Sequence, residues 1–288
     1  MTAAGLRVVA MCCDGLPQRH FLARLESACR VVAVVLHSTP AARGALAARL
    51  RRIANPVRFA RHIAARWLVG RWLDRTERET RQLFAIEGRL PLLPTRARLV
   101  RTGDVNAPEV VALVRDIRPD VVVVNGTNLL RAPLLDLAPG IPLGYVNLHT
   151  GLSPYTRGGN CNLWALLEGH PEWVGVTVHR IDAGIDSGEL IATAQTPLFA
   201  DDLYESIHDR NFRQGFDLML AALGPLAAGK VTPVRQWEEG RLYLKRTGYR
   251  YEPWLHVRVN RMIRRGLITR YLERREEIDR GVRTVKLP

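Results

Sequence analysis

Three short apolar runs in the first half of the chain constrain its fold more than any other feature. Residues 121–124 are four consecutive valines, and a strand that is apolar on both faces is buried on both faces. Residues 6–11 and 31–36 are similar runs, and the segment 17–30 between them has apolar side chains at helical spacing. This order is typical of a β-α-β unit. We therefore predict an α/β protein whose mostly parallel sheet is flanked by helices.

The same alternation continues along the chain. We predict strands at 97–100, 143–149, 174–181 and 189–197, and helices at 107–118, 133–137, 163–167 and 202–223. Asn106 is the predicted N-cap of the first of these helices. Gly224 and Pro225 should stop or kink the last one, and Gly229 is its latest expected end. The whole pattern predicts a Rossmann-like fold.

A basic segment at about residues 40–88 interrupts this alternation. Large apolar side chains lie there among many arginines, namely Leu50, Ile53, Val57, Ile63, Trp67, Leu68 and Trp72. We interpret the segment as an insert of two or three amphipathic helices in a main domain of residues 1–230. Residues 231–288 form a short C-terminal extension, with a ribbon-like stretch at 234–245 and an arginine-rich tail from Tyr249.

The formal net charge of +14 raises nucleic acid or an anionic membrane surface as a partner. However, 39 of the 42 basic residues are arginines, a bias that a GC-rich coding sequence also produces, so charge alone is a weak indication. The insert fits a solvated helical hairpin, and it equally fits basic helices that lie on a membrane or grip a large substrate. These alternatives stay open.

Cysteine usage and the N-terminal residues indicate the compartment. The four cysteines lack the paired spacing of a zinc site and are too few for a disulfide framework in a chain of 288 residues. The first residues lack the features of a signal peptide, and no apolar run approaches the roughly 18 residues of a spanning helix. We therefore expect a cytoplasmic protein without a metal site, and peripheral attachment to the inner membrane surface stays open.

An amide, an imidazole and a carboxylate lie on or beside the loops that follow the later strands. Asn147 and His149 are two residues apart on a predicted strand, so their side chains share a face and can converge on one bound group. Asp186 follows on a loop between Gly184 and Gly188 that can fold back against them. Since α/β folds usually build their sites at such loops, these three residues are candidates for a catalytic group.

Three ordered motifs surround these residues. The first runs from Asn147 to Gly158 and contains Asn-Leu-His and then Leu-Ser-Pro-Tyr-Thr-Arg-Gly. The second is Gly-Val-Thr-Val-His at 175–179, and the third is Asp-Ala-Gly-Ile-Asp-Ser-Gly at 182–188. This order and spacing resembles the formyltransferase family that uses 10-formyltetrahydrofolate, which includes methionyl-tRNA and glycinamide ribonucleotide formyltransferases. The resemblance covers about residues 95–245.

The resemblance implies that residues 1–230 are a catalytic domain, that 10-formyltetrahydrofolate donates the formyl group and that no metal takes part. It implies that the folate contacts two loops, through Gly126, Thr127, Asn128, Leu129, Leu130, Arg131, Ile181 and Asp182. An amine attacks the formyl carbon, so negative charge develops on the carbonyl oxygen and the nitrogen must lose a proton. Asn147 can donate to that oxygen. His149 can stabilise the oxyanion or relay the proton, and Asp186 can hold its protonation state or an ordered water.

Neighbouring residues have alternative interpretations. Tyr155, Arg157 and Gly158 are predicted to bind the substrate, although Arg157 could equally brace its own loop. Asp182 is either a second carboxylate of the site or a turn residue. We interpret His179 as a packed core histidine and Cys161 as a small buried side chain.

Features that this chain lacks narrow the range of possible acceptor substrates. Glycinamide ribonucleotide formyltransferases usually have a Gly-Ser-Gly-Ser-Asn loop after the first strand, where this chain has Cys12-Cys13-Asp14-Gly15. Methionyl-tRNA formyltransferases have a C-terminal β-barrel, whereas the 58 residues after Lys230 are mostly helical in pattern. A formyltetrahydrofolate hydrolase would need an additional N-terminal domain. We predict an amino sugar on a nucleotide or lipid carrier as the small-molecule acceptor, with tRNA less favoured. A non-catalytic lipid-surface binding protein is the alternative from another class, and the oligomeric state stays open.

Overall fold

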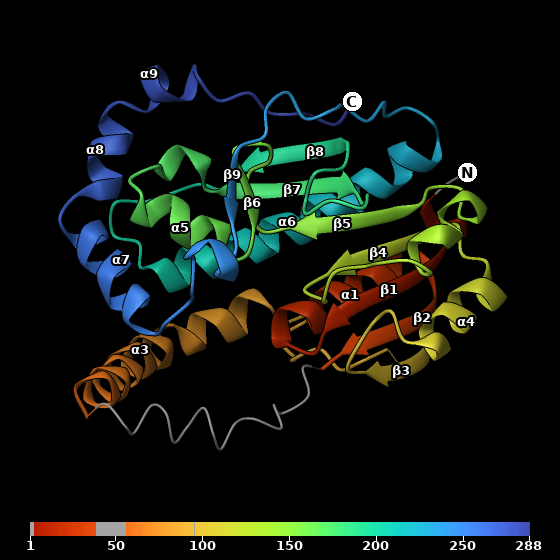
Figure 1. The fold of residues 1–288 in the computed structure, drawn as a ribbon, viewed down its shortest axis with the longest axis horizontal. Coiled ribbons are helices and arrows are strands. Elements are labelled where there is room, and N and C mark those ends of the chain that lie inside the picture. The colour runs from red at the N-terminus through yellow and green to blue at the C-terminus, as the bar shows by residue number, and fades with distance from the viewer. Residues whose placement is uncertain (1–2, 39–55, 95) are drawn as a thin grey trace.

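The computed structural model describes residues 3–38, 56–94 and 96–288 of the chain. At its centre is a seven-stranded sheet in the order β3-β2-β1-β4-β5-β7-β8 (Figure 1). The strands are β1 (Arg7–Cys13), β2 (Arg30–His37), β3 (Arg98–Thr102), β4 (Val121–Asn125), β5 (Tyr145–His149), β7 (Gly175–Arg180) and β8 (Leu190–Gln195). The first five in the sheet order pair in parallel, and β7 pairs antiparallel with both β5 and β8. The predicted Rossmann-like α/β fold is confirmed.

Helices cover both faces of the sheet, which explains why its inner strands are apolar on both faces. α1 (Leu16–Ala28) and α6 (Tyr204–Ala227) lie on one face, where Phe21 stacks on Phe216 with ring centroids 4.7 Å apart. α4 (Pro108–Ile117) packs on the opposite face. Every residue of β4 is buried, so the prediction made from its valines is confirmed.

The start of α4 differs from the prediction by one residue. Pro108 fixes the first helical position, so the residue just before it, Ala107, is the N-cap. Asn106 is left free to bond elsewhere. Its side-chain amide donates to the Leu129 carbonyl at 2.9 Å, and its side-chain oxygen accepts the Arg131 N–H at 2.7 Å. Asn106 therefore fastens the loop after β4 instead of capping a helix.

The basic insert also differs from the prediction. Its described part is one helix, α3 (Pro56–Leu83), where two or three were expected, and residues 39–55 lie outside the described residues. Gly70 does not break α3, since a glycine inside a helix costs only about 1 kcal/mol relative to alanine. α3 extends from the sheet and packs against α6 and α7 (Trp254–Arg264) (Figure 1). None of the helices described is long and apolar enough to cross a membrane.

The end of α6 lies beyond Pro225 and before Gly229, its latest expected end. The helix passes through Gly224 and Pro225 and continues to Ala227 without stopping at the proline. Pro225 lies in the last turn, where its missing N–H costs only one hydrogen bond near the helix end. Gly229, at a φ of 66°, then takes the left-handed conformation that commonly terminates a helix.

The C-terminal extension packs directly on the catalytic segment. β9 (Arg241–Tyr243) pairs in parallel with β6 (Thr156–Gly158), and α7 is followed by α8 (Leu267–Glu273) and α9 (Arg275–Asp279). These helices surround α5 (Cys161–Leu167) (Figure 1). One buried apolar cluster joins the two parts and includes Leu163, Leu166, Val259, Ile263 and Ile268. The extension therefore shares its core with the residues before it.

We predict that Phe216→Ala lowers the free energy of unfolding by about 3–5 kcal/mol, because it removes a fully buried ring and leaves a cavity beside Phe21. Phe59→Ala is the matched control, since that ring is 40% exposed on α3, and its effect should stay within about 0.5 kcal/mol. Urea unfolding followed by circular dichroism measures both. Equal losses for the two variants would contradict this assignment of the core.

Candidate active site

A cleft of about 410 Å³ opens at the carboxyl ends of β4 and β5. This is the edge where a parallel sheet of this kind binds ligands, beside the point at which the strand order reverses. Asn147, His149 and Asp186 all line the cleft. The three predicted catalytic residues therefore lie together in the structure.

The paired strands β5 and β7 position the Asn147 amide and the imidazoles of His149 and His179. Asn147 on β5 lies directly opposite His179 on β7 in an antiparallel pair, and Asn147 Nδ2 is 3.0 Å from His179 Nε2. His179 Nδ1 lies 2.7 Å from the Arg180 carbonyl oxygen. His149 is two residues beyond Asn147, is buried and also lines the cleft, as the strand periodicity predicts.

The loop after β7 is shaped by Asp182. Its Oδ1 accepts the Gly184 N–H at 3.0 Å and the Ser187 hydroxyl at 2.7 Å. This is the turn-forming role that the sequence left open beside a catalytic one. Asp182 also lines the cleft, so its backbone and side chain remain available to a bound folate.

The same loop carries Asp186 back over β5. Asp186 has a φ of 47°, a left-handed conformation that costs a non-glycine residue on the order of 1 kcal/mol. Gln236 holds it there, donating to the carbonyl oxygens of Asp186 at 2.7 Å and Gly188 at 3.0 Å. Gly188 lies so close to the Arg180 carbonyl that a Cβ would collide with it. Tertiary contacts therefore impose the loop conformation.

The Asp186 carboxylate is the common partner of the site. Its Oδ2 accepts the Gly158 N–H at 2.9 Å and lies 3.3 Å from His149 Nδ1. Its Oδ1 lies 3.4 Å from both Asn147 Nδ2 and His179 Nε2. Burial alone would raise the pKa of Asp186, but the two imidazoles and the Gly158 N–H outweigh burial and hold that pKa well below its usual range. Asp186 is therefore ionised at neutral pH.

His149 is a buried base. Burial lowers its pKa below the ordinary value of 6.5, and the nearby Asp186 carboxylate offsets only part of that shift, so the ring is neutral at neutral pH. Its Nε2 is 3.2 Å from the Thr156 carbonyl oxygen, while its Nδ1 faces Asp186. A neutral ring has one N–H and can satisfy only one of these oxygens, whereas a protonated ring satisfies both. The protein therefore already provides acceptors for the protonated form.

Seven of the eight residues predicted to contact the folate line the cleft. They are Gly126, Thr127, Asn128, Leu129, Leu130, Ile181 and Asp182. Asn128 is held by Asp104, whose Oδ1 accepts the Asn128 amide at 2.7 Å. Arg131 is not brought to the cleft, because its backbone is tied to Asn106 and its side chain is exposed outside it.

Of the residues predicted to bind the substrate, only Gly158 lines the cleft. The Tyr155 ring stacks on Trp173, and its hydroxyl oxygen accepts the Arg283 N–H at 2.6 Å, so Tyr155 anchors the C-terminal tail. Arg157 is partly buried on β6, opposite Leu242 of β9, and is not among the lining residues. In this loop it is the backbone at Gly158, more than the side chains at 155 and 157, that faces the cleft.

His179 is the site residue that the sequence interpretation missed. It was interpreted as a packed core histidine, and it is indeed buried, but it also lines the cleft and contacts Asn147 and Asp186. Its place at the end of the Gly-Val-Thr-Val-His motif was the available signal. Phe212 of α6 and Leu244 just after β9 also line the cleft, and no local sequence pattern indicated them.

Two other chemistries find no support in the described residues. Burial raises the pKa of the Cys161 thiol well above its ordinary value, so this cysteine is a packed side chain and no nucleophile. No group of three histidine, cysteine, aspartate or glutamate residues within the described ranges could hold a metal ion.

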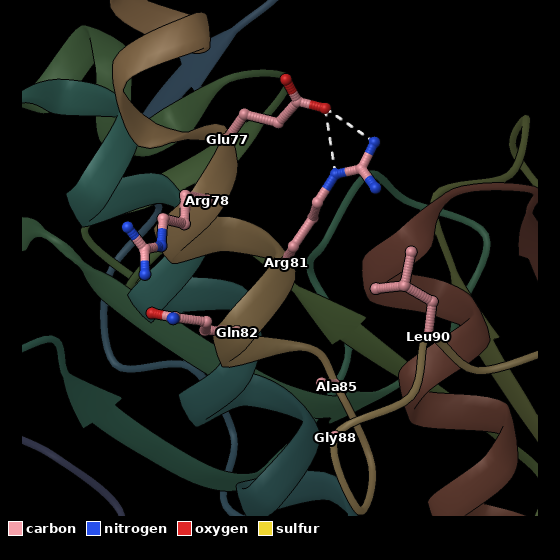
Figure 2. Close-up of a pocket in the computed structure, with 7 residues that line it drawn as sticks. All are labelled: Glu77, Arg78, Arg81, Gln82, Ala85, Gly88 and Leu90. Carbon is pink, nitrogen blue, oxygen red and sulfur yellow. Dashed lines mark hydrogen bonds and ion pairs between the residues drawn. The ribbon is translucent and has the colours of Figure 1, made fainter.

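A wider hollow of about 760 Å³ lies outside the cleft, at the end of α3 (Figure 2). Glu77 and Arg81 form an exposed ion pair at 2.8 Å there, and Arg78 and Gln82 lie on the same stretch of helix. None of the predicted site residues lines this hollow. It is therefore a surface groove separate from the site.

Comparison with known proteins gives the same family that the site geometry suggests. The family model for formyl transferases matches residues 23–223. A methionyl-tRNA formyltransferase of Halorhodospira halophila is 38% identical over 143 residues, which is 50% of this chain and 44% of that protein. The chain thus matches less than half the length of this curated relative.

Solved structures share the fold. A Mycobacterium tuberculosis protein described as a candidate sugar N-formyltransferase has a TM-score of 0.53 at 19% identity, with 90% of this chain and 87% of that chain covered. A glycinamide ribonucleotide transformylase of Symbiobacterium toebii has a TM-score of 0.52 at 18% identity, with 80% and 94% covered.

The fold and the cleft define an α/β protein with an asparagine, two histidines and an aspartate at the carboxyl edge of its sheet. Since the family model spans well over half of the sequence, the chain belongs to the formyl transferase family.

We predict that Asp186→Asn lowers the pKa of His149 further, because it removes the charge that favours the protonated ring. NMR titration of the His149 ring, assigned with a His149→Gln variant, measures the shift. Asp182→Asn is the matched control, since Asp182 bonds only within its loop. An unchanged or raised His149 pKa in Asp186→Asn would contradict the described coupling.

Proposed function

We propose that this protein transfers the formyl group of 10-formyltetrahydrofolate to a substrate amine. The observation that carries the proposal is the contact of one ionised carboxylate, Asp186, with both the Asn147 amide and the His149 ring at the end of β5. An amide donor, a buried base and a fixed carboxylate are the groups that this reaction needs. No covalent nucleophile is required.

The roles follow from the charges that develop in the reaction. Asn147 donates an N–H to the formyl oxygen as it gains negative charge, and a preorganised donor of this kind contributes a few kcal/mol. His149, neutral at the start, takes up the proton that the amine releases. The Asp186 carboxylate and the Thr156 carbonyl then each accept one N–H of the charged ring, which offsets the cost of a buried cation.

The cleft suits the folate donor. Its lining alternates polar backbone at Gly126 and Asp182 with apolar side chains at Leu130 and Ile181, the combination that holds a flat heterocycle. Its volume of about 410 Å³ lies in the range of small-molecule sites. When bound, 10-formyltetrahydrofolate would supply the reactive formyl carbon beside Asn147.

For the acceptor we propose an amino sugar on a nucleotide or lipid carrier. The competing acceptor is charged tRNA, because the curated relatives are methionyl-tRNA formyltransferases. The residues after β9 favour the sugar. They fold as α7, α8 and α9 against α5, an arrangement unlike the barrel strands with which the tRNA enzymes hold their substrate.

We further propose that α3 rests on an anionic membrane, where a lipid-linked acceptor would lie. Phe59, Ile63 and Trp67 are spaced four residues apart on α3 and are 40%, 49% and 61% exposed. Arg66 and Arg71 are exposed beside them, and the Arg71 guanidinium lies over the Trp67 ring. An exposed apolar row with arginines beside it is the pattern of a helix that lies in the membrane interface.

We expect Asn147→Ala to lower kcat by about 10²–10³-fold, the usual effect of removing one oxyanion donor, and His149→Ala to lower it at least as much. The assay incubates protein and 10-formyltetrahydrofolate with a panel of amino sugar nucleotides, aminoacylated tRNA and amino acids, and follows the release of tetrahydrofolate. Gln82→Ala, in the separate groove, is the control. Undiminished transfer by Asn147→Ala would refute the assignment, and folate release without any acceptor would indicate hydrolysis.

Vesicle sedimentation tests the membrane proposal. The protein should bind vesicles that contain phosphatidylglycerol more tightly than phosphatidylcholine vesicles, and high salt should weaken that binding. Trp67→Glu should reduce binding several-fold, because it places a negative charge in the apolar row. Leu92→Glu, at a position 77% exposed outside α3, adds the same charge and should bind like the wild type. Salt-insensitive binding, or an equal loss of vesicle binding in both variants, would disprove that α3 binds the membrane through this apolar row.

A further inference from the structure

A second pocket lies next to the formyl cleft. Its volume is about 420 Å³, and it is enclosed by α3, the start of α6 and the segment that leads into α7. Asn160 lines both this pocket and the cleft. Asn160 is only two residues beyond Gly158, whose N–H binds Asp186. The pocket is therefore adjacent to the reacting groups.

The pocket is lined by carboxylates and aromatic rings. The carboxylates are Glu77, Glu205 and Asp209, the rings include Tyr204 and Tyr251, and no arginine or lysine is among the lining residues described. Carboxylates accept hydrogen bonds from hydroxyl and ammonium groups and repel phosphate. Aromatic rings offer a flat apolar surface. The pocket therefore suits a hydroxyl-rich ring that is neutral or cationic.

One wall of the pocket is rigid. Glu205 is buried, with one oxygen 2.7 Å from His256 Nδ1 and the other accepting the Asn260 amide at 2.9 Å. The Tyr251 hydroxyl lies 3.0 Å from His256 Nε2. Burial would raise the pKa of Glu205, but these hydrogen bonds hold it below the ordinary value, so the carboxylate stays ionised. Glu205 thus fixes His256 and, through it, the Tyr251 ring.

Asp209 is the carboxylate best placed to bind a ligand. One of its oxygens accepts the Thr80 hydroxyl. The other lies 3.6 Å from His208 Nδ1, too far for a strong hydrogen bond. Glu77, by contrast, is paired with Arg81 (Figure 2). Asp209 therefore has an oxygen that can accept a hydroxyl or ammonium N–H.

We propose that this pocket binds the hydroxyl-bearing ring of the acceptor, with the amine-bearing edge of the ring at Asn160, where the pocket meets the cleft. This inference rests on the proposed formyl transfer and specifies its substrate class. A sugar ring satisfies Asp209 by hydrogen bonds and Tyr251 by stacking.

Saturation-transfer NMR tests the pocket with D-glucosamine as the probe and the protein saturated with tetrahydrofolate. Glucosamine should bind the wild type. Asp209→Asn and Tyr251→Ala should each weaken glucosamine binding by about fivefold or more. Glu79→Gln, on α3 but outside the lining, should bind like the wild type.

The outcomes separate this inference from the formyl transfer on which it rests. Asn147→Ala should lose transfer and keep Asp209-dependent glucosamine binding. If no acceptor is formylated while that binding persists, the proposed function fails and the pocket assignment stands. The pocket assignment is overturned if glucosamine does not bind, if Asp209→Asn binds it as the wild type does, or if aminoacylated tRNA is formylated equally well by wild type and Asp209→Asn.

Discussion

The ionised Asp186 carboxylate is the group on which the rest of the site depends. It is only 16% exposed, and an unpaired charge at such a depth costs several kcal/mol. The charge is tolerated because the Gly158 N–H, the Asn147 amide and two imidazoles surround it. These partners come from three separate segments of the chain. The site therefore forms only when β5, β7 and the loop that contains β6 are all correctly placed relative to one another.

The C-terminal extension holds some of these segments in place. Gln236 binds the Asp186 and Gly188 carbonyls, and β9 pairs with β6 so closely that a side chain at residue 158 would strike the Tyr243 carbonyl. Gly158, with a φ of 99°, is thus held where its N–H meets Asp186. The extension is distant from the catalytic residues in sequence, yet it fixes two of the backbone segments that position the carboxylate.

Local periodicity could predict the sheet and part of the site. The valines of β4 indicated burial on both faces, and the spacing of Asn147 and His149 placed both at the cleft. The role of His179 depends on its antiparallel register opposite Asn147, which no local pattern contains. The same holds for Tyr155, whose hydroxyl is bound by a residue 128 positions away. The N-cap at Ala107 is different, because the neighbouring Pro108 sets it and the sequence alone contained that signal.

Charge acts on two length scales in this molecule. The net charge of +14 produces a positive field that reaches about 8–10 Å into solution at physiological salt and attracts anions of any kind. At contact distance the pocket beside the cleft presents the opposite sign, through Asp209, Glu205 and Glu77. The positive field would attract an acceptor with an anionic carrier. If the ring of that acceptor is neutral or cationic, the ring also suits the negatively charged pocket.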